Sequence, residues 1–274
     1  MTDMCAYFAY SRAAYYKSLK VEEKSFLSGS LILDMVRGER CLQPRLGGKK
    51  LYWMLGSDIR AIVPHFGRDK FLSLLREHDL LVERKREYRK TTHSYHHFHK
   101  YGNLIKDLCI VRSNQAWASD ITYLRTEKGF VYLSLLTDMY SRKIVGWSVS
   151  NSLSIEGSVA ALKRALRENP VELPLIHHSD RGVQYCSHEY VRILKKKSIS
   201  ISMTEENHCY ENAMAERVNG ILKDEYLLDR TFNDLSDAQK ACKEAIILYN
   251  TRRPHWSLKF KTPEQMHHVR YEAA

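Results

Sequence analysis

The chain has 274 residues, 44% of them hydrophobic, which is enough to bury a substantial core in one large domain or two smaller ones. It contains no run of about 18 apolar residues and no basic N-terminal segment leading into an apolar run. We therefore expect neither a membrane span nor a secretory signal, and place the protein in the cytoplasm. The six cysteines are scattered without a Cys-x-x-Cys pair, which indicates reduced thiols.

The charge of the chain indicates a polyanionic partner. Its formal net charge is +11 and its isoelectric point is near 9.3. Residues 1–110 carry 20 Lys and Arg against 12 Asp and Glu, whereas residues 111–274 carry 23 against 20. Basic side chains that neutralise phosphates release condensed counterions, which favours nucleic acid. Charge alone leaves RNA, DNA and an anionic membrane surface open.

The first third of the chain predicts an all-α helix-turn-helix region over residues 1–90. Short amphipathic helices are expected in "SRAAYYKSL", "GGKKLYWMLGSD" and "GRDKFLSLLREHDLL", with Ser11 as a cap. The apolar positions of the second and third are Leu51, Met54, Leu55, Phe71, Leu74, Leu75 and Leu81. The cations on the polar sides are predicted DNA contacts: Arg45, Lys49, Lys50, Arg68 and Lys70.

A basic, His-rich stretch follows, "VERKREYRKTTHSYHHFHKYG", with neither a helical nor a strand period. We interpret residues 91–113 as a linker. We expect Arg84, Lys85 and Arg86, in the first part of the basic stretch, to lie along phosphates. A solvated tether is the alternative. Zinc is not favoured at its four histidines, because no cysteine or carboxylate pair stands at ligand spacing nearby.

Residues 114–274 predict a mixed α/β layer fold. Strands are expected at 117–124, at 174–179 and at 199–203, and 129–150 reads as two strands joined by a turn. Helices are expected at 154–166, 188–198 and 211–227. Strands followed by alternating helices and strands are typical of a mixed sheet with helices packed on it.

Three carboxylates stand out in this region: Asp120 inside the first strand, Asp180 at the end of the strand at 174–179, and Glu216 on the long helix. The first pair is separated by 59 residues and the second by 35. Adjacent strands and a covering helix would bring them together, and their mutual repulsion requires cations. Two Mg²⁺ ions, with Mn²⁺ as a substitute, would neutralise them and activate a water or a sugar hydroxyl. Lys223, seven residues past Glu216, shares its helix face and suits a phosphate contact.

Each of these residues also has a structural interpretation. Asp138 is the alternative first acid, although an Asp before a turn usually caps backbone. His177 and His178 fit strand packing or support of the acids. Gln184 and Tyr185 fit either turn closure or DNA contact. Arg252 and Arg253, in a proline-bearing loop after a helix, either grip DNA or end the domain.

Several motifs together resemble one family. "WASDITYL", "HHSDRGVQY", "NAMAERVNGILKDE" and "YNTRRPHWSLKFKTPEQM" are similar to the integrase-type catalytic core of insertion-sequence transposases. Asp180 and Glu216 reproduce the spacing of its D,D-35-E motif. The N-terminal motifs "SRAAYYK", "PRLGGKKLYWML" and "GRDKFLSLLREHDLLVERKR" resemble the second open reading frame, OrfB, of the IS-three insertion-sequence family.

This resemblance implies a ribonuclease-H-like catalytic core at 114–274 and a polynucleotidyl transferase that cuts DNA by hydrolysis and joins it by transesterification with a 3′ hydroxyl. It implies catalysis and metal binding by Asp120, Asp180 and Glu216. The implied partners are the element's terminal repeats, target DNA, further copies of the chain on DNA and a product fused to an upstream frame, in a bacterial nucleoid. Two alternatives remain: a ribonuclease-H-type nuclease, and a non-catalytic DNA-binding regulatory relic.

Overall fold

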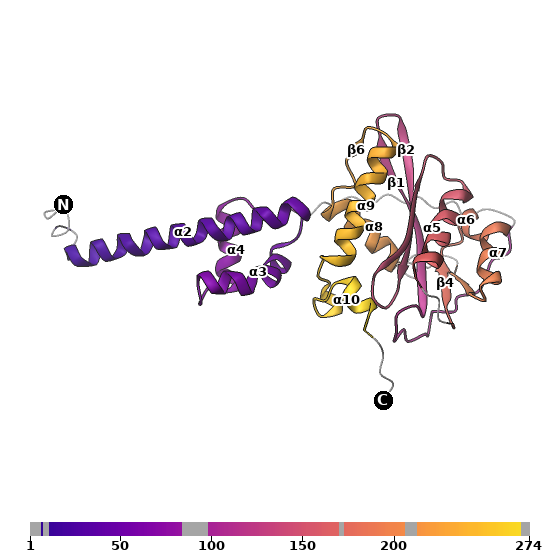
Figure 1. Cartoon of the computed structure of the whole chain (residues 1–274), viewed down its shortest axis with the longest axis horizontal. Helices are drawn as coiled ribbons and strands as arrows, with labels where there is room; N and C mark the ends of the chain where they lie inside the picture. The colour runs from indigo at the N-terminus through magenta and orange to yellow at the C-terminus, as the bar shows by residue number, and fades with distance from the viewer. Residues whose placement is uncertain (1–6, 8–10, 84–97, 170–172, 206–212, 270–274) are drawn as a thin grey trace. The chain divides into compact units, whose positions relative to one another are not determined.

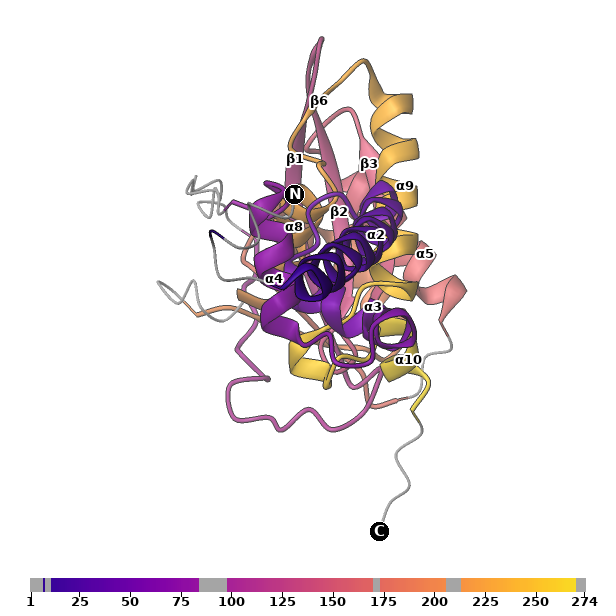
Figure 2. The same cartoon turned by 90° about the vertical axis from the view of Figure 1, so that its left-hand side faces the viewer.

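A computed structural model describes residues 7, 11–83, 98–169, 173–205 and 213–269. The chain divides into two compact units, Met1–Arg84 and Lys85–Ala274. Figures 1 and 2 show the elements of both units. In the described part of the chain, no helix is both long enough and apolar enough to cross a membrane.

The first unit is helical, as the sequence predicts. It contains α2 (Arg12–Leu42), α3 (Gly48–Ile62) and α4 (Arg68–Glu77), which pack around a core that includes Ile32, Val36, Leu51, Ile59, Phe71 and Leu75. Ser11 caps α2, because its Oγ accepts a hydrogen bond from the Ala14 N–H at 3.0 Å. The expectation of a short first helix is wrong: α2 runs for 31 residues, with no proline to interrupt it.

One predicted core position in this unit is also wrong. Leu81 is 40% exposed, whereas Leu80 packs against the core. The reason is that α4 ends at Glu77 and Asp79 takes a left-handed backbone conformation with φ of 52°, so the helical period does not extend to Leu81. Lys49, Arg68 and Lys70 have exposed side chains.

The second unit is built on a mixed sheet. Its strands are β1 (Ala116–Thr126), β2 (Gly129–Asp138), β3 (Ile144–Ser150), β4 (Ile176–Ser179), β5 (Ser200–Met203) and β6 (Thr231–Phe232). The sheet order is β3-β2-β1-β4-β5, and the short β6 also pairs with β1. β1, β2 and β3 form an antiparallel meander, whereas β4 pairs with β1, and β5 with β4, in parallel.

Helices cover both faces of this sheet (Figure 1). One layer contains α8 (Ala213–Glu225) and α9 (Leu235–Thr251), which pack with Leu124, Leu133 and Val149 in one core. The other layer contains α5 (Ile155–Glu168), α6 (Val183–Cys186) and α7 (His188–Lys196), around Trp117 and Val145. The short η2 (Trp256–Leu258) and α10 (Pro263–His267) follow α9.

The described part of the predicted linker, residues 98–113, belongs to the second unit and packs on its core. Phe98 and Tyr101 contact its core. The Leu104 N–H donates to Ser202 Oγ at 2.9 Å, and the Met203 N–H donates to the Gly102 carbonyl at 3.2 Å. This segment is therefore held along β5. Arg84, Lys85, Arg86, His93, His96 and His97 lie outside the described residues.

A glycine allows α5 to pack closely on the edge strand β3. A Cβ added at Gly146 would meet the backbone carbonyl of Ala161 and lie 2.6 Å from Ala165 Cβ. Neither backbone nor a methyl group can move aside without displacing the helix.

We expect Gly146→Ala to destabilise the second unit by about 1–3 kcal/mol, the usual range for overpacking. Chemical denaturation followed by far-ultraviolet circular dichroism measures this. Gly220→Ala on α8 is the control, because nothing lies within 4 Å of a Cβ there and Ala favours a helix interior over Gly. Equal stabilities of the two variants would contradict the close packing.

Candidate active site

The pairing of β1 with β4 places two aspartates at the same level of the sheet. The parallel register joins Ala116 to Ile176 and Ala118 to His178. Continued two residues further, to the residue just past the end of β4, this register would set Asp120 level with Asp180. The negative charges of Asp180 and of Glu216 both raise the pKa of Asp120, which shows that the three carboxylates share one electrostatic environment.

Asp180 is held by the turn that follows β4. Its Oδ1 accepts a hydrogen bond from the Gly182 N–H at 2.9 Å, and the Ser179 hydroxyl donates to its backbone carbonyl at 2.9 Å. A Cβ on Gly182 would lie 2.9 Å from the same Oδ1. The glycine therefore allows the backbone to approach the carboxylate closely and to orient it.

Asp120 is held by α8 and by its own strand. The Asn219 side-chain amide donates to Oδ2 at 2.7 Å, and the Ile121 N–H donates to Oδ1 at 2.9 Å. Burial and then the Asp180 charge raise the pKa of Asp120 to about 7, against the two hydrogen bonds, which lower it. The Asp120 carboxyl group therefore keeps its proton to a much higher pH than an ordinary aspartate.

Glu216 lies in the first turn of α8, one turn before Asn219, with an exposed side chain. Its charge is the smallest influence on the pKa of Asp120. Among the residues that the structure describes, no three His, Cys, Asp or Glu side chains lie close enough together to hold a metal ion. The structure thus brings Asp120 and Asp180 together and leaves Glu216 nearby but not converged with them.

Lys223 lies on α8 one turn after Asn219 and is half-buried. Its Nζ sits 4.3 Å from the centre of the Tyr123 ring. Burial lowers the pKa of Lys223, while the charges of Asp120 and Asp229 raise it. The lysine therefore adds a positive charge beside the acids.

The donor set fits a hard divalent cation. It offers oxygen atoms only, and two of its carboxylates repel one another. Asn219 Oδ1 is buried and has no hydrogen-bond partner among the described residues, so an acceptor oxygen next to Asp120 is available to a cation or to its water. Asn219 was not predicted from the sequence, although its position three residues after Glu216 is a helical-face signal.

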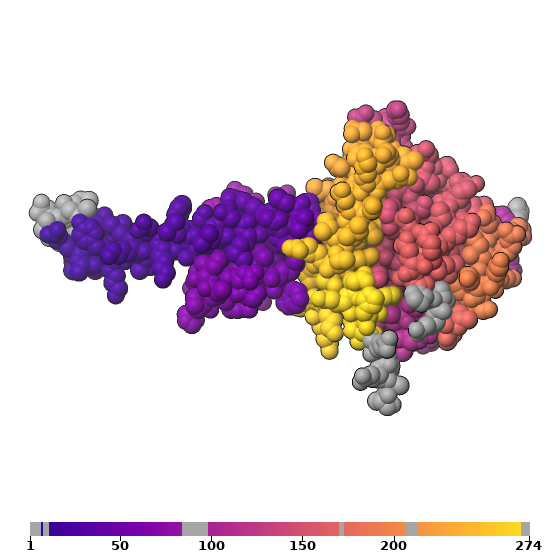
Figure 3. All heavy atoms as spheres, in the orientation of Figure 1, coloured from indigo at the N-terminus to yellow at the C-terminus, as the bar shows by residue number. Residues whose placement is uncertain are grey.

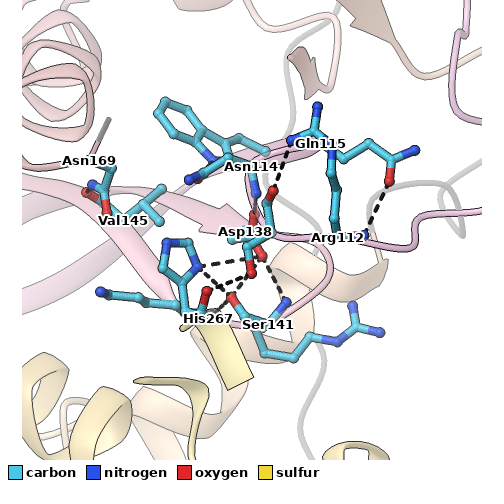
Figure 4. Close-up of polar contacts among 12 residues, drawn as sticks. Arg112, Asn114, Gln115, Asp138, Ser141, Val145, Asn169 and His267 are labelled. Atoms are coloured by element: carbon cyan, nitrogen blue, oxygen red, sulfur yellow. Dashed lines mark hydrogen bonds and ion pairs between the residues drawn. The ribbon is translucent and has the colours of Figure 1, made fainter. Parts of the chain in front are cut away.

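The alternative acid, Asp138, has a structural role at the β2–β3 turn (Figure 4). It is fully buried and pairs with Trp117 in the sheet register, three positions from the partner of Asp120. Its carboxylate accepts hydrogen bonds at 2.7 Å from the Asn114 N–H, the Ser141 N–H and the Ser141 hydroxyl. We therefore keep Asp120 as the first acid.

The residues before and after Asp180 make contacts inside the second unit. His177 Nε2 lies 2.7 Å from Ser119 Oγ and 2.8 Å from the Tyr190 hydroxyl oxygen, and burial lowers the pKa of His177 to about 3. Tyr185 is buried as well, and its N–H closes the turn by donating to the Gly182 carbonyl. Gln184 donates to the Leu153 carbonyl at 2.8 Å. Turn closure and packing thus account for these side chains.

The two predicted DNA-binding arginines after α9 differ in position. Arg252 is exposed. Arg253 is only 3% exposed and makes two hydrogen bonds of 2.7 Å to the Glu225 carboxylate, which joins the end of α8 to the loop. Because its guanidinium is occupied inside the protein, we correct the DNA-contact interpretation of Arg253 to a structural one.

We expect Asp120→Asn to raise the melting temperature of the metal-free protein by several degrees at pH 8 and by much less at pH 4. The folded pKa of about 7 lies above the ordinary 3.8. Between pH 3.8 and about pH 7, Asp120 keeps its proton in the folded chain but has lost it in the unfolded chain. The free energy of unfolding of the wild type therefore falls as the pH rises through this range. Asp224→Asn, at an exposed carboxylate of α8, is the control. A pH-independent difference would contradict the assignment.

We expect Asn219→Ala to raise the pKa of Asp120 further, because the variant loses a donor that favours the ionised form. A carboxyl-carbon NMR titration of the metal-free protein measures this shift. Asn219→Asp should raise it more, since a third negative charge is added. An unchanged or lower pKa in both variants would rule out this role of Asn219.

Comparison with known proteins places the chain in a family. Two family models described as "Integrase core domain" match residues 111–209 and 197–263. The "Insertion element IS600 uncharacterized 31 kDa protein" of Shigella sonnei is 32% identical over 256 residues, 92% of this chain and 93% of that protein. The "Transposase InsF for insertion sequence IS3A" of Escherichia coli (strain K12) is 34% identical over 163 residues, 59% and 57% of the two chains.

The fold is also that of a solved integrase. A chain of the simian T-cell lymphotropic virus intasome in complex with PP2A regulatory subunit B56 gamma superposes with a TM-score of 0.52 at 19% identity, over 78% of this chain and 72% of that one. This likeness confirms the predicted ribonuclease-H-like, mixed-sheet core. The chain belongs to the IS3 family of insertion-sequence transposases, which carry an integrase core domain.

Proposed function

We propose that this transposase cuts DNA at the ends of its insertion element and joins the cut ends to target DNA. The observation that supports the proposal is the parallel pairing of β1, which contains Asp120, with β4, which Asp180 follows, together with Glu216 and Lys223 on α8. In the first reaction a water oxygen bonds to phosphorus and the strand's 3′ oxygen leaves. In the second that 3′ hydroxyl attacks a target phosphate and displaces the target's 3′ oxygen.

The proposed metal ligands are Asp120, Asp180 and Glu216, for two Mg²⁺ ions or Mn²⁺. Such ions supply a lowered pKa for the attacking hydroxyl and neutralise charge on the phosphate. The chain itself orients the ligands: Asn219 fixes Asp120, and the Gly182 N–H fixes Asp180. Lys223 draws the scissile phosphate toward acids that would otherwise repel it.

The proposed DNA-binding surface of the first unit contains the exposed Lys49, Arg68 and Lys70 together with the half-buried Arg45 and Lys50. Arg45 donates to the Glu83 backbone carbonyl. Arg68 forms an ion pair with Asp69, but exposed ion pairs are weak. Arg252 is the proposed contact after α9. Further proposed partners are other copies of the chain bound to DNA and a protein product fused to an upstream reading frame. The proposed location is the bacterial chromosomal DNA.

We expect Asp180→Asn to reduce Mg²⁺-dependent joining of element-end oligonucleotides to a target plasmid by at least about 100-fold, the scale for removal of a group that stabilises reacting charge. The control is Asp224→Asn, at an exposed carboxylate of α8. Gel analysis separates cut from joined products, and circular dichroism checks folding.

Other results would identify a different protein activity. Joining by the Asp180→Asn variant at the wild-type rate would rule out the catalytic assignment. Cutting without joining by the wild type would identify a nuclease. DNA binding with neither reaction in Mg²⁺ or Mn²⁺ would identify a regulatory protein.

A further inference from the structure

A groove lies over the outer strand of the sheet, away from the acids. It has a volume of about 680 Å³ and is lined by β3 and by the facing sides of α5 and α9. These two helices form neighbouring strips on one face of the molecule (Figure 3). β3 is separated from β1, which carries Asp120, by β2. The groove is therefore distinct from the candidate active site.

The groove is strongly cationic. Five of the described residues that line it are Lys163, Arg164, Arg167, Lys240 and Lys243, and none of the lining residues is Asp or Glu. They repeat at helical spacing, so the charges of each helix face the same way. We call this surface the basic groove.

Few acids offset these charges. Arg164 and Arg167 approach Glu168 at 3.5 and 2.9 Å, and Lys163 approaches Glu189 at 3.7 Å, all at partly or fully exposed positions. Such pairs are screened by solvent and leave most of the positive potential in place. For Lys240 and Lys243, the structure gives no ion pair among the residues it describes.

The edge of β3 is closed to another strand. Three outward carbonyls along it each accept a hydrogen bond from a side chain: Val145 from Asn169 at 2.9 Å, Trp147 from Arg164 at 3.2 Å and Val149 from Gln239 at 3.2 Å. Figure 4 shows Asn169 beside Val145. Side chains that occupy an edge in this way prevent strand addition.

The Arg164 guanidinium also lies over the Trp147 ring, 4.2 Å from its centre. This contact supports the arginine on a partly buried aromatic surface and restricts its movement. The floor of the basic groove is therefore pre-organised, whereas the lysines around it are long and adaptable.

We propose that the basic groove binds duplex DNA along its sugar-phosphate backbone, without reading the sequence. A second copy of the chain would bring like charges together and finds no open strand edge, whereas phosphates match both the charge and the spread of the cations. The proposal rests on the proposed function only in taking DNA as the substrate. It adds a second DNA-binding surface on the catalytic unit.

The test is the salt dependence of binding by the full chain to a mixed-sequence duplex without element ends. The groove variant is Lys163→Ala/Lys240→Ala/Lys243→Ala, which leaves the Arg164–Trp147 stack intact. We expect the slope of log K against log[salt] to become shallower by about 2 to 3, since each lost phosphate contact removes about 0.9.

The matched control removes three exposed cations of and after α7, as Arg192→Ala/Lys196→Ala/Lys197→Ala. We expect its slope to change by less than about 1. Equal changes in the two variants would overturn the proposal, because they would reflect net charge alone. This binding assay requires no joining, so a failure of the catalytic proposal, which the Asp180→Asn variant tests, is distinguished from a failure of the groove proposal.

A photo-cross-linking residue at the exposed Ser236, which lines the groove, identifies the occupant directly. Cross-links to DNA support the proposal. Cross-links to a second copy, together with dissociation of an oligomer by the groove variant in sedimentation, would overturn it.

Discussion

The parallel pairing of β1 with β4 is the constraint on which the proposed chemistry depends. It places Asp120 and Asp180 side by side although 59 residues separate them. Two neighbouring carboxylates repel, and burial adds to the cost, so the pair is unfavourable in the metal-free chain at neutral pH. The hydrophobic cores on both faces of the sheet must supply the free energy that holds it there.

α8 links this pair to the rest of the unit. Its apolar residues Val218 and Leu222 pack in the core, while Asn219 between them reaches Asp120. At its end, Glu225 forms the buried ion pair with Arg253. The helix is therefore fixed along its middle and its end. Glu216 lies in the first turn with an exposed side chain, although Ala215 beside it is buried.

The sequence predicted the helices and strands that a local pattern of apolar residues encodes. Strand alternation and helical periods predicted the strands β1 to β5 and the helices α5, α7 and α8, but not the short α6. The places of Asp120 inside β1 and of Asp180 just after β4 singled out the two aspartates. Contacts between distant residues were not predictable in this way: Arg253 reads as a surface cation until Glu225 is seen beside it. The length of α2 was missed because its first half buries few residues, so it shows little amphipathic period. The hydrogen bonds that close the edge of β3 were not predictable either, because they come from Arg164 on α5, from Asn169 just after it and from Gln239 on α9.

The residues that attract DNA are largely different from the acids that carry the proposed chemistry. Carboxylates repel DNA, so the acid pair adds nothing to binding until cations neutralise it. Attraction must come from other surfaces, and the chain has cations on its first unit, in the basic groove and at Lys223. Most cations on the first unit and in the basic groove are exposed and therefore sensitive to salt, whereas Lys223 is half-buried beside Asp120 and is screened less. Salt should accordingly weaken the capture of DNA more than it alters the step that follows at the acids.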